Sequence, residues 1–293
     1  MTRPQPAVQI RDAATVMLVR DEAQGMEVFM LRRNLDSDFV GGAYVFPGGA
    51  VDEADRHADL SRICTGRTDE QASDQLGIPK GGLAYWVAAV RECFEEAGVL
   101  LAVPDGGADD HVISFAEPST AARFTTHRHD VDHGRRRLIE VCEEEGLRLD
   151  VDRIHYFSHW ITPEGPPRRY DTRFFVAAAP PEQVPLHDDR ETIANLWVRP
   201  QDALERHARG ELDLILPTIK NLEAIGRFDR SADLLAHAAT ISSVPAILPR
   251  IVHDGGGMRI LLPDDAGYGE AVGAIPAGTP MPGRPGGPAI AGA

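Results

Sequence analysis

The sequence predicts an α/β protein in which a mixed sheet lies between layers of helices. Short runs rich in β-branched and aliphatic residues alternate with segments of helical periodicity along most of the chain. Such alternation is typical of strands and helices that share one core. The chain has 293 residues, of which 43% are hydrophobic and 26% charged, so it has enough length and apolar content for one large globular domain.

The first predicted elements are two strands that form a hairpin. Residues 13–20 and 27–33 are rich in β-branched and aliphatic side chains, and the polar residues 21–25 form the expected turn. Residues 52–82 are rich in charge and glycine, so we expect them to form a helical excursion over the functional site.

Residues 83–97 have the clearest helical pattern. Their apolar side chains recur at helical spacing on one face, at Trp86, Ala89, Val90, Cys93, Phe94 and Ala97. Gly98 fits the left-handed position that ends a helix, and residues 99–103 have the composition of a buried strand.

The second half of the chain continues the alternation of helices and strands. We expect a helical insertion with helices at 118–124 and 135–145, strands at 154–161, 173–179 and 193–198, a helix from about Pro200, helices at 214–227 and 231–239, and a hairpin of 246–253 with 258–262.

These elements predict a single domain over residues 1–270. It would carry insertions at about 56–83 and 104–150. Residues 271–293 are dominated by Gly, Pro and Ala, a composition typical of a disordered tail.

Composition and charge narrow the class of function. The formal net charge of −15 argues against a general nucleic-acid binder, although a metal and a few local arginines would still allow a phosphorylated small molecule to bind. The three cysteines, Cys64, Cys93 and Cys142, lack the CxxC spacing of a zinc site and form no disulfide framework.

The sequence also bears on location and assembly. No apolar run approaches the length that spans a bilayer, and neither a signal segment nor the peroxisomal carboxyl-terminal tripeptide is present. We therefore expect a cytoplasmic protein without a membrane partner. A homodimer stays open, because nothing in the sequence identifies an interface.

Three carboxylates fall on one face of the helix predicted over residues 83–97. Glu92, Glu95 and Glu96 stand at i, i+3 and i+4, so their side chains project together. Such close like charges repel one another unless a cation lies between them, and hard oxygen ligands suit Mg²⁺ or Mn²⁺. The alternative is a solvated charged face, which is the ordinary role of glutamates on a helix.

Two glycines upstream strengthen the metal interpretation. Gly48 and Gly49 follow a short apolar run, where they allow the backbone to approach a ligand closely and leave carbonyl oxygens free to coordinate a cation.

Together these segments resemble the signature of the Nudix hydrolase superfamily. That signature is a Gly, five residues, a Glu, seven residues, then Arg-Glu-apolar-any-Glu-Glu-any-Gly-apolar. Gly49 fits the opening glycine, and the second half matches from Arg91 to Val99, with Cys93 in the first apolar slot. The resemblance implies an α/β/α sandwich with a mixed central sheet, to which this chain would add helical insertions, extra C-terminal helices and a hairpin.

Two departures from the signature point to one branch of the superfamily. Asp55 stands where the first Glu is expected, and residues 56–90 separate it from Arg91 instead of seven residues. Asp is one methylene shorter than Glu, so the sequence leaves open whether Asp55 reaches Arg91. An interrupted box is similar to that of the mammalian peroxisomal coenzyme A diphosphatases, and the segments 39–49, 160–163, 168–175 and 261–263 also resemble that subgroup.

This resemblance implies hydrolysis of coenzyme A or acyl-coenzyme A to adenosine 3′,5′-bisphosphate and (acyl)phosphopantetheine. A separate coenzyme A signature is half present: Arg33, Gly42 and Phe46 fit it, whereas Asp38 and Leu31 replace its second Arg and its Thr. Two alternatives stay open. One is the same chemistry on ADP-ribose, NADH or another nucleoside diphosphate derivative, and the other is a non-catalytic nucleotide-binding Nudix module.

The resemblance also implies roles for the acidic residues and for Arg91. Glu92 and Glu96 would be direct metal ligands, Glu95 a direct or water-mediated one, and the carbonyl of Gly48 a further ligand. Arg91 would orient these carboxylates through bidentate contacts. The general base would be Glu191, unless Glu191 is only a solvated loop acid and Glu96 takes that role.

Several residues are candidates for contact with substrate. Guanidinium groups chelate phosphate in a fork, so Arg168, Arg169, Arg173 and Arg33 could bind the 3′-phosphate or the diphosphate, although each could equally pair with surface acids. Phe46, Gly48 and Gly49 would complete the substrate wall. His127, His129 and His133 lie in a polar segment where we expect no helix, and we assign them no metal.

Overall fold

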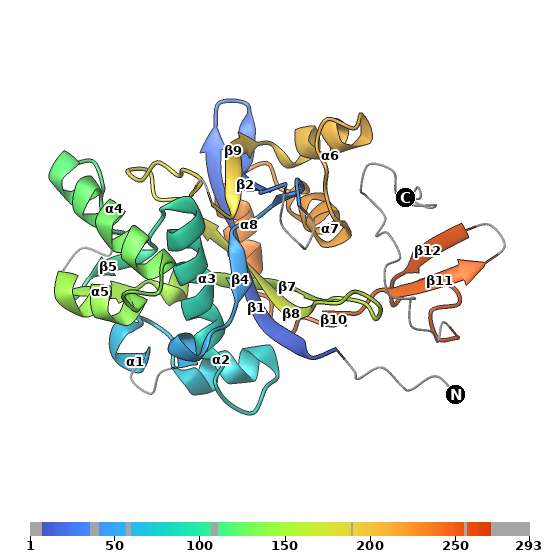
Figure 1. Cartoon of the computed structure of the whole chain (residues 1–293), viewed down its shortest axis with the longest axis horizontal. Helices are drawn as coiled ribbons and strands as arrows, with labels where there is room; N and C mark the ends of the chain where they lie inside the picture. The colour runs from blue at the N-terminus through green and yellow to red at the C-terminus, as the bar shows by residue number, and fades with distance from the viewer. Residues whose placement is uncertain are drawn as a thin grey trace.

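The central feature of the fold is an eight-stranded mixed sheet between two layers of helices (Figure 1). The computed structural model describes residues 8–35, 41–56, 60–106, 111–188, 190–254 and 257–270. The sheet contains β1 (Ile10–Glu22), β2 (Gly25–Arg33), β3 (Tyr44–Val45), β4 (Gly48–Ala50), β7 (His155–Ile161), β8 (Arg169–Ala178), β9 (Thr192–Val198) and β10 (Ala246–Ile247). This architecture is the predicted α/β sandwich.

Strand β1 organises the sheet because it pairs with three other strands. It forms the predicted antiparallel hairpin with β2, runs parallel to β8 over ten residue pairs, and pairs antiparallel with β4 at its beginning. The strand order is β10-β7-β8-β1-β2-β3, with β9 added on β2. Residues that alternate along β1 therefore face two different cores.

Helix α3 (Leu83–Ala97) covers one face of the sheet, and its bounds agree with the prediction. Its apolar face is fully buried, and the Trp86 ring packs against Phe175 of β8 at a centroid distance of 4.7 Å. Gly98 ends the helix in the left-handed conformation, with φ of 69°, as its position predicted.

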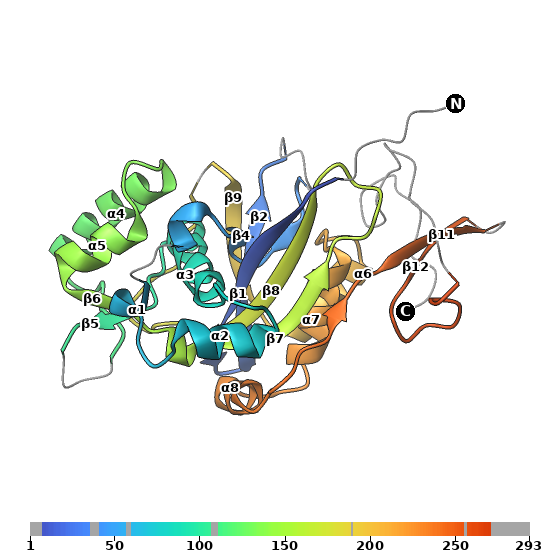
Figure 2. The same cartoon turned by 90° about the horizontal axis from the view of Figure 1, so that it is seen from below.

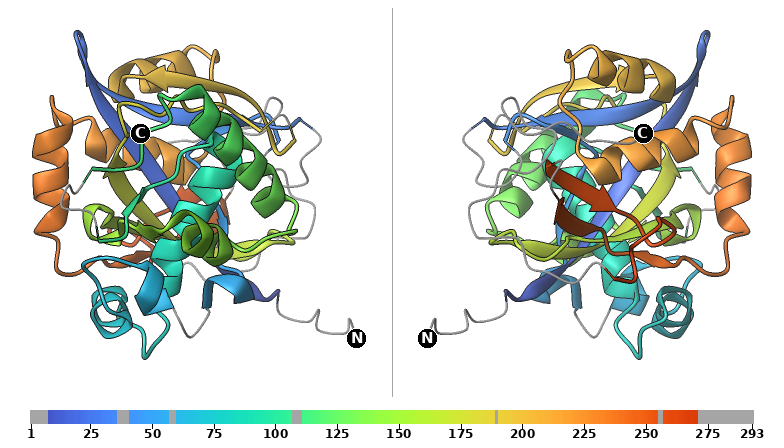
Figure 3. Two further views of the ribbon diagram at one scale, coloured as in Figure 1. Left: turned by 90° about the vertical axis from the view of Figure 1, so that its left-hand side faces the viewer. Right: turned by 90° about the vertical axis from the view of Figure 1, so that its right-hand side faces the viewer.

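The opposite face of the sheet is covered by three helices near the end of the chain. These are α6 (Pro200–Ala208), α7 (Leu216–Ile225) and α8 (Ser231–Ala239). They bury a second core against β1, β2 and β8, so the sheet lies between α3 on one side and these helices on the other (Figures 2 and 3).

The first insertion consists of short helices beside the start of α3. It follows the turn η1 (Glu53–Arg56) and contains α1 (Leu60–Ile63) and α2 (Asp69–Leu76). The Asp69 carboxylate accepts hydrogen bonds from the N–H groups of Gly81 and Leu83, at 2.9 and 3.0 Å, and so caps the N-terminus of α3. The excursion is helical as predicted.

The second insertion contains one helix that is longer and one that is shorter than its sequence predicted. Helix α4 runs over Pro118–Asp132 and α5 over Leu138–Glu145, with a two-stranded sheet of β5 (Ala102–Pro104) and β6 (Leu147–Leu149). The expected helix end at residue 124 and the expected start at 135 were wrong. The polar residues after 124 remain helical because Phe124, His127 and Val131 form a buried stripe at helical spacing.

Two predicted strand boundaries also need correction. Residues 99–101 are buried but not in a strand, since β5 begins at Ala102. The strand expected over 246–253 is divided: β10 joins β7 of the large sheet, whereas β11 (Arg250–Asp254) pairs with β12 (Gly257–Leu261). The resulting hairpin projects from the body in Figures 1 and 2.

Some expectations fall outside the residues that the structure describes. These are the position of Asp38 and the nature of the tail over 271–293. Within the described ranges, none of the helices has both the length and the apolar character that crossing a bilayer requires.

We predict that Gly82→Ala destabilises the fold by about 1–3 kcal/mol, because a methyl group there has no space. A Cβ at Gly82 would lie 2.5 Å from the carbonyl carbon of Ala72, and the backbone of α2 cannot move away easily. Urea unfolding measures the loss. Gly269→Ala is the control, because nothing lies within 4 Å of its added Cβ. Equal stability of the two variants would contradict the steric argument.

Candidate active site

A cavity of about 560 Å³ lies against the acidic face of α3. Glu92 and Glu95 line the cavity directly. Glu96 is only 3% exposed, and one of its carboxylate oxygens accepts a hydrogen bond of 2.9 Å from the N–H of Gly48. The acidic face of α3 is therefore not the solvated face that the sequence left as an alternative.

Arg91 joins the two separated halves of the motif in space. Its Nε and Nη2 atoms donate to the two oxygens of Asp55 at 2.8 Å each, which is a bidentate ion pair. Its Nη1 atom donates to Glu92 at 2.9 Å and to Glu95 at 2.8 Å. Asp55 thus reaches Arg91 despite its short side chain, because η1 brings the Asp55 backbone close to α3.

Strand β4 brings the glycine pair against these carboxylates. A Cβ at Gly48 would overlap the backbone of Ala14, 2.6 Å from its carbonyl oxygen. A Cβ at Gly49 would overlap the carboxylate of Glu92, 2.6 Å from its carboxyl carbon. Only glycine allows β4 to pass between β1 and α3 at this distance.

Burial makes the charged forms of the carboxylates costly. Desolvation raises the pKa of Glu95 to about 7, although the charge and hydrogen bond of Arg91 oppose it. Desolvation likewise raises the pKa values of Glu92 and Glu96. The charge of Glu95 adds to this effect on Glu92, and the charge of Glu92 adds to it on Glu96. A divalent cation among these oxygens would favour the charged forms, so the donor set fits a hard cation.

A second group of potential ligands lies on α4 and α5, at His127, Glu144 and Glu145. Arginines already occupy these atoms. Arg123 donates to Glu145 at 2.7 Å, and Arg136 contacts both Glu144 and the Nδ1 atom of His127. The group is therefore an ion-pair network that needs no metal. The expectation that no helix carries His127 and His129 was wrong, since both lie on α4.

Part of the cavity wall is apolar. It is lined by side chains from β7, β8, α7 and β12 together with the segment before β4, namely Phe46, Trp160, Phe174, Leu216, Pro217 and Ile260. One cavity thus connects buried carboxylates to an apolar wall. Of the segment 52–82 that we expected to cover the site, Asp52 lines the cavity, and none of its other described residues does.

The arginines proposed for substrate do not all reach the cavity. Arg33 and Arg168 line it, whereas Arg169 uses its Nε atom to bind the carbonyl of Thr162 at 3.1 Å. Arg173 is 4% exposed, pairs with Asp171 and lies over the Tyr85 ring.

Arg173 does not line the cavity as we expected, and the alternation of side chains along β8 explains why. Side chains alternate along β8, so Thr172 and Phe174 face the cavity while Arg173 faces the α3 side of the sheet. The structure therefore places Arg173 where it cannot contact a ligand in the cavity.

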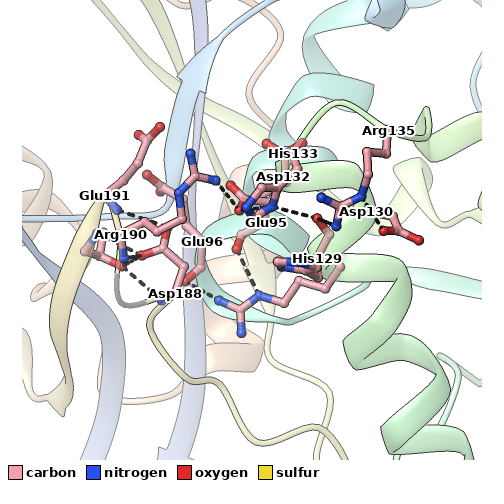
Figure 4. Close-up of polar contacts among 12 residues, drawn as sticks. Glu95, Glu96, His129, Asp130, Asp132, His133, Arg135, Asp188, Arg190 and Glu191 are labelled. Atoms are coloured by element: carbon pink, nitrogen blue, oxygen red, sulfur yellow. Dashed lines mark hydrogen bonds and ion pairs between the residues drawn. The ribbon is translucent and has the colours of Figure 1, made fainter.

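Glu191 lies on the cavity wall, at the residue before β9. Its charge adds to the burial that raises the pKa of Glu96. The backbone around it is fixed by Asp188, whose carboxylate accepts hydrogen bonds from the N–H groups of Arg190, Glu191 and Thr192 (Figure 4).

Sequence reasoning missed one wall of the cavity. Val131, Asp132 and Gly134, at the end of α4, line it. The Asp132 charge adds to the effects that raise the pKa of Glu95. The helical spacing of residues 124, 127 and 131, which are buried in the structure, could have predicted that the helix extends this far.

The fold and the site together define a Nudix hydrolase, because the carboxylates of α3, Arg91 and the glycine pair of β4 lie together at one cavity. A family model described as the NUDT19 Nudix domain matches residues 61–225, and the chain belongs to this family. It is therefore an enzyme of the Nudix diphosphatase class.

Similar proteins support this assignment. The chain is 30% identical over 280 residues to the human acyl-coenzyme A diphosphatase NUDT19, covering 85% of this chain and 74% of the human protein. The Gallus gallus protein of the same name is also 30% identical, over 83% of this chain and 73% of its own. The crystal structure of a NUDIX hydrolase from Alicyclobacillus acidocaldarius has a TM-score of 0.64 and 29% identity, covering 81% of this chain and 99% of that one.

We predict that Asp55→Ala destabilises the protein by about 3–5 kcal/mol, because it leaves the buried Arg91 charge without its bidentate partner. Chemical unfolding measures the change. Asp52→Ala is a matched control, since Asp52 approaches Arg91 only to 3.8 Å and its side chain is 64% exposed. That control should change stability by less than about 0.5 kcal/mol. A small loss in both variants would contradict the importance of the Asp55 pair.

Proposed function

We propose that this enzyme hydrolyses the diphosphate of coenzyme A or acyl-coenzyme A. The products are adenosine 3′,5′-bisphosphate and (acyl)phosphopantetheine. The observation that carries the proposal is the single cavity that joins buried carboxylates to an apolar wall. A diphosphate that carries an acyl chain would contact both the carboxylates, through a metal, and the apolar wall. The names of the human and Gallus gallus relatives support the same substrate class.

The α3 carboxylates are the proposed metal site, for Mg²⁺ or Mn²⁺. Glu92 and Glu96 are direct ligands, with Glu95 and the carbonyl of Gly48 completing the set. A bound divalent ion would neutralise the diphosphate and activate a water molecule for in-line attack. Arg91 orients Glu92 and Glu95 through its two hydrogen bonds and does not reach for substrate, because all its nitrogen atoms already have partners in the protein.

The attacking water must give up a proton to a nearby base. Glu191 is our proposed base, because it lines the cavity and is exposed at the loop before β9. Glu96 is the alternative. Its carboxylate is buried and already accepts the Gly48 N–H, which leaves it less free to receive a proton from water.

We assign each part of the substrate to the cavity residues whose chemistry suits it. Arg33 lines the cavity near Glu96 and would bind the diphosphate, and Arg168 would bind the 3′-phosphate. Phe46, Trp160 and Leu216 would contact the pantetheine and acyl portions, where burial of apolar surface favours binding. A cytoplasmic location, a homodimer and a single domain over residues 1–270 remain predictions of the sequence alone.

We predict that Glu96→Gln lowers kcat by about 10²-fold or more, the size that follows loss of a preorganised electrostatic group. The amide oxygen can still accept the Gly48 hydrogen bond, so the fold should persist. Hydrolysis is measured with Mg²⁺ or Mn²⁺ against coenzyme A esters, ADP-ribose, NADH and dinucleoside polyphosphates. Wild-type turnover by this variant would refute the metal role, and a preference for ADP-ribose or NADH would refute the substrate.

We predict that Arg168→Ala raises KM for coenzyme A by about tenfold, through loss of a charge-assisted contact with the 3′-phosphate. Dephospho-coenzyme A lacks that group, so its KM should not change. Arg169→Ala is the matched control, because Arg169 does not line the cavity and its guanidinium binds Thr162. An equal effect of Arg168→Ala on both substrates would mean that Arg168 does not distinguish the 3′-phosphate.

A further inference from the structure

Helix α4 contacts the end of α3 that carries the carboxylates. The Arg128 guanidinium donates from Nε to the carbonyl of Glu95 at 2.9 Å and from Nη2 to the carbonyl of Glu96 at 3.0 Å. Carbonyl groups in the last turn of a helix lack partners within the helix and carry partial negative charge. Arg128 therefore holds the backbone of the two residues whose side chains form the acidic site.

The same arginine also holds the loop before β9. Its Nη2 atom donates to the carbonyl of Leu186 at 3.0 Å, and the Leu186 N–H donates to the carbonyl of Ala97 at 2.9 Å. The end of α3, the end of α4 and this loop are thus joined through one guanidinium group.

A second contact between α4 and the loop lies one turn further along the helix. Asp132 accepts a hydrogen bond of 2.5 Å from Arg190, and its carboxylate is 3.1 Å from Nδ1 of His133 (Figure 4). Arg190 directly precedes Glu191. The backbone N–H groups of both residues bind the carboxylate of Asp188, so the Asp132 contact acts on residues that Asp188 also holds.

We propose that Arg128 is a positioning residue for the diphosphatase reaction, and that the Asp132–Arg190 pair assists it. Arg128 fixes the backbone of Glu95 and Glu96 relative to the loop that carries Glu191. The two sides of the catalytic cavity then keep the spacing that the reaction requires. This inference rests on the proposed function, since it assumes that these carboxylates hold the metal.

The geometry distinguishes this role from simple stabilisation. Helix α3 is also capped at its other end, where Asp69 of α2 binds the N–H groups of Gly81 and Leu83. That cap lies about 18 Å along the helix from Glu95, at a rise of about 1.5 Å per residue. Both caps should stabilise α3, but only Arg128 contacts the residues that carry the carboxylates.

The test compares Arg128→Ala with Asp69→Ala. Substrate turnover and the binding of Mn²⁺ alone are measured for each purified full-length variant. Arg128→Ala should lower kcat and Mn²⁺ affinity by about 10-fold to 100-fold, as loss of groups that orient metal ligands does, with KM changed far less. Asp69→Ala should lower the thermal midpoint but leave kcat and Mn²⁺ affinity within about twofold of wild type. Arg128→Lys should restore part of the loss, because one ammonium can bind at least one of the three carbonyls.

Two results would overturn the inference while leaving the proposed function intact. In the first, Arg128→Ala lowers only the thermal midpoint, as Asp69→Ala does, and both kcat and Mn²⁺ affinity stay at the wild-type level. In the second, kcat falls equally in both variants. If the wild-type protein itself neither binds Mn²⁺ nor hydrolyses a diphosphate, the proposed function fails and the inference fails with it.

Discussion

The ion pair between Arg91 and Asp55 is the interaction on which the site depends. One guanidinium binds both oxygens of Asp55 and also reaches Glu92 and Glu95. All of these contacts are largely shielded from water, and charge-assisted bonds are strong in such surroundings. The pair fixes η1 against α3 whatever the length of the chain between them. An insertion inside the motif is therefore compatible with an intact site.

The two insertions hold opposite ends of the helix that bears the carboxylates. The first supplies Asp69 at the N-terminus of α3, and the second supplies Arg128 at the C-terminus. Each charge has the sign that favours its end of the helix dipole. Among the described residues of the two insertions, only those of the second also line the cavity, through the end of α4. Both inserted segments thus stabilise α3 from outside the central α/β/α sandwich.

The local pattern predicted most of the fold and the common face of the three α3 carboxylates. The bounds of α3 and the β1–β2 hairpin followed from periodicity and turn residues, because such signals depend on neighbours in sequence. The direction of Arg173 depends on which face of β8 forms the cavity, and its neighbours Thr172 and Phe174 face the cavity while Arg173 lies over Tyr85 of α3. The sequence of the strand alone does not contain that information. Contacts such as Asp132 with Arg190 join residues that are 58 positions apart, and no local pattern contains them.

The balance of charge in the cavity explains why an acidic protein can bind an anionic substrate. Asp55, Glu92 and Glu95 share the single positive charge of Arg91, so negative charge remains at the α3 end. A diphosphate brought there without a cation would meet repulsion in a medium that screens charge poorly. The proposed divalent ion removes this repulsion at the carboxylates, while Arg33 and Arg168 supply positive charge at the walls. The net charge of −15 is therefore a property of the whole surface and does not describe the field inside the cavity.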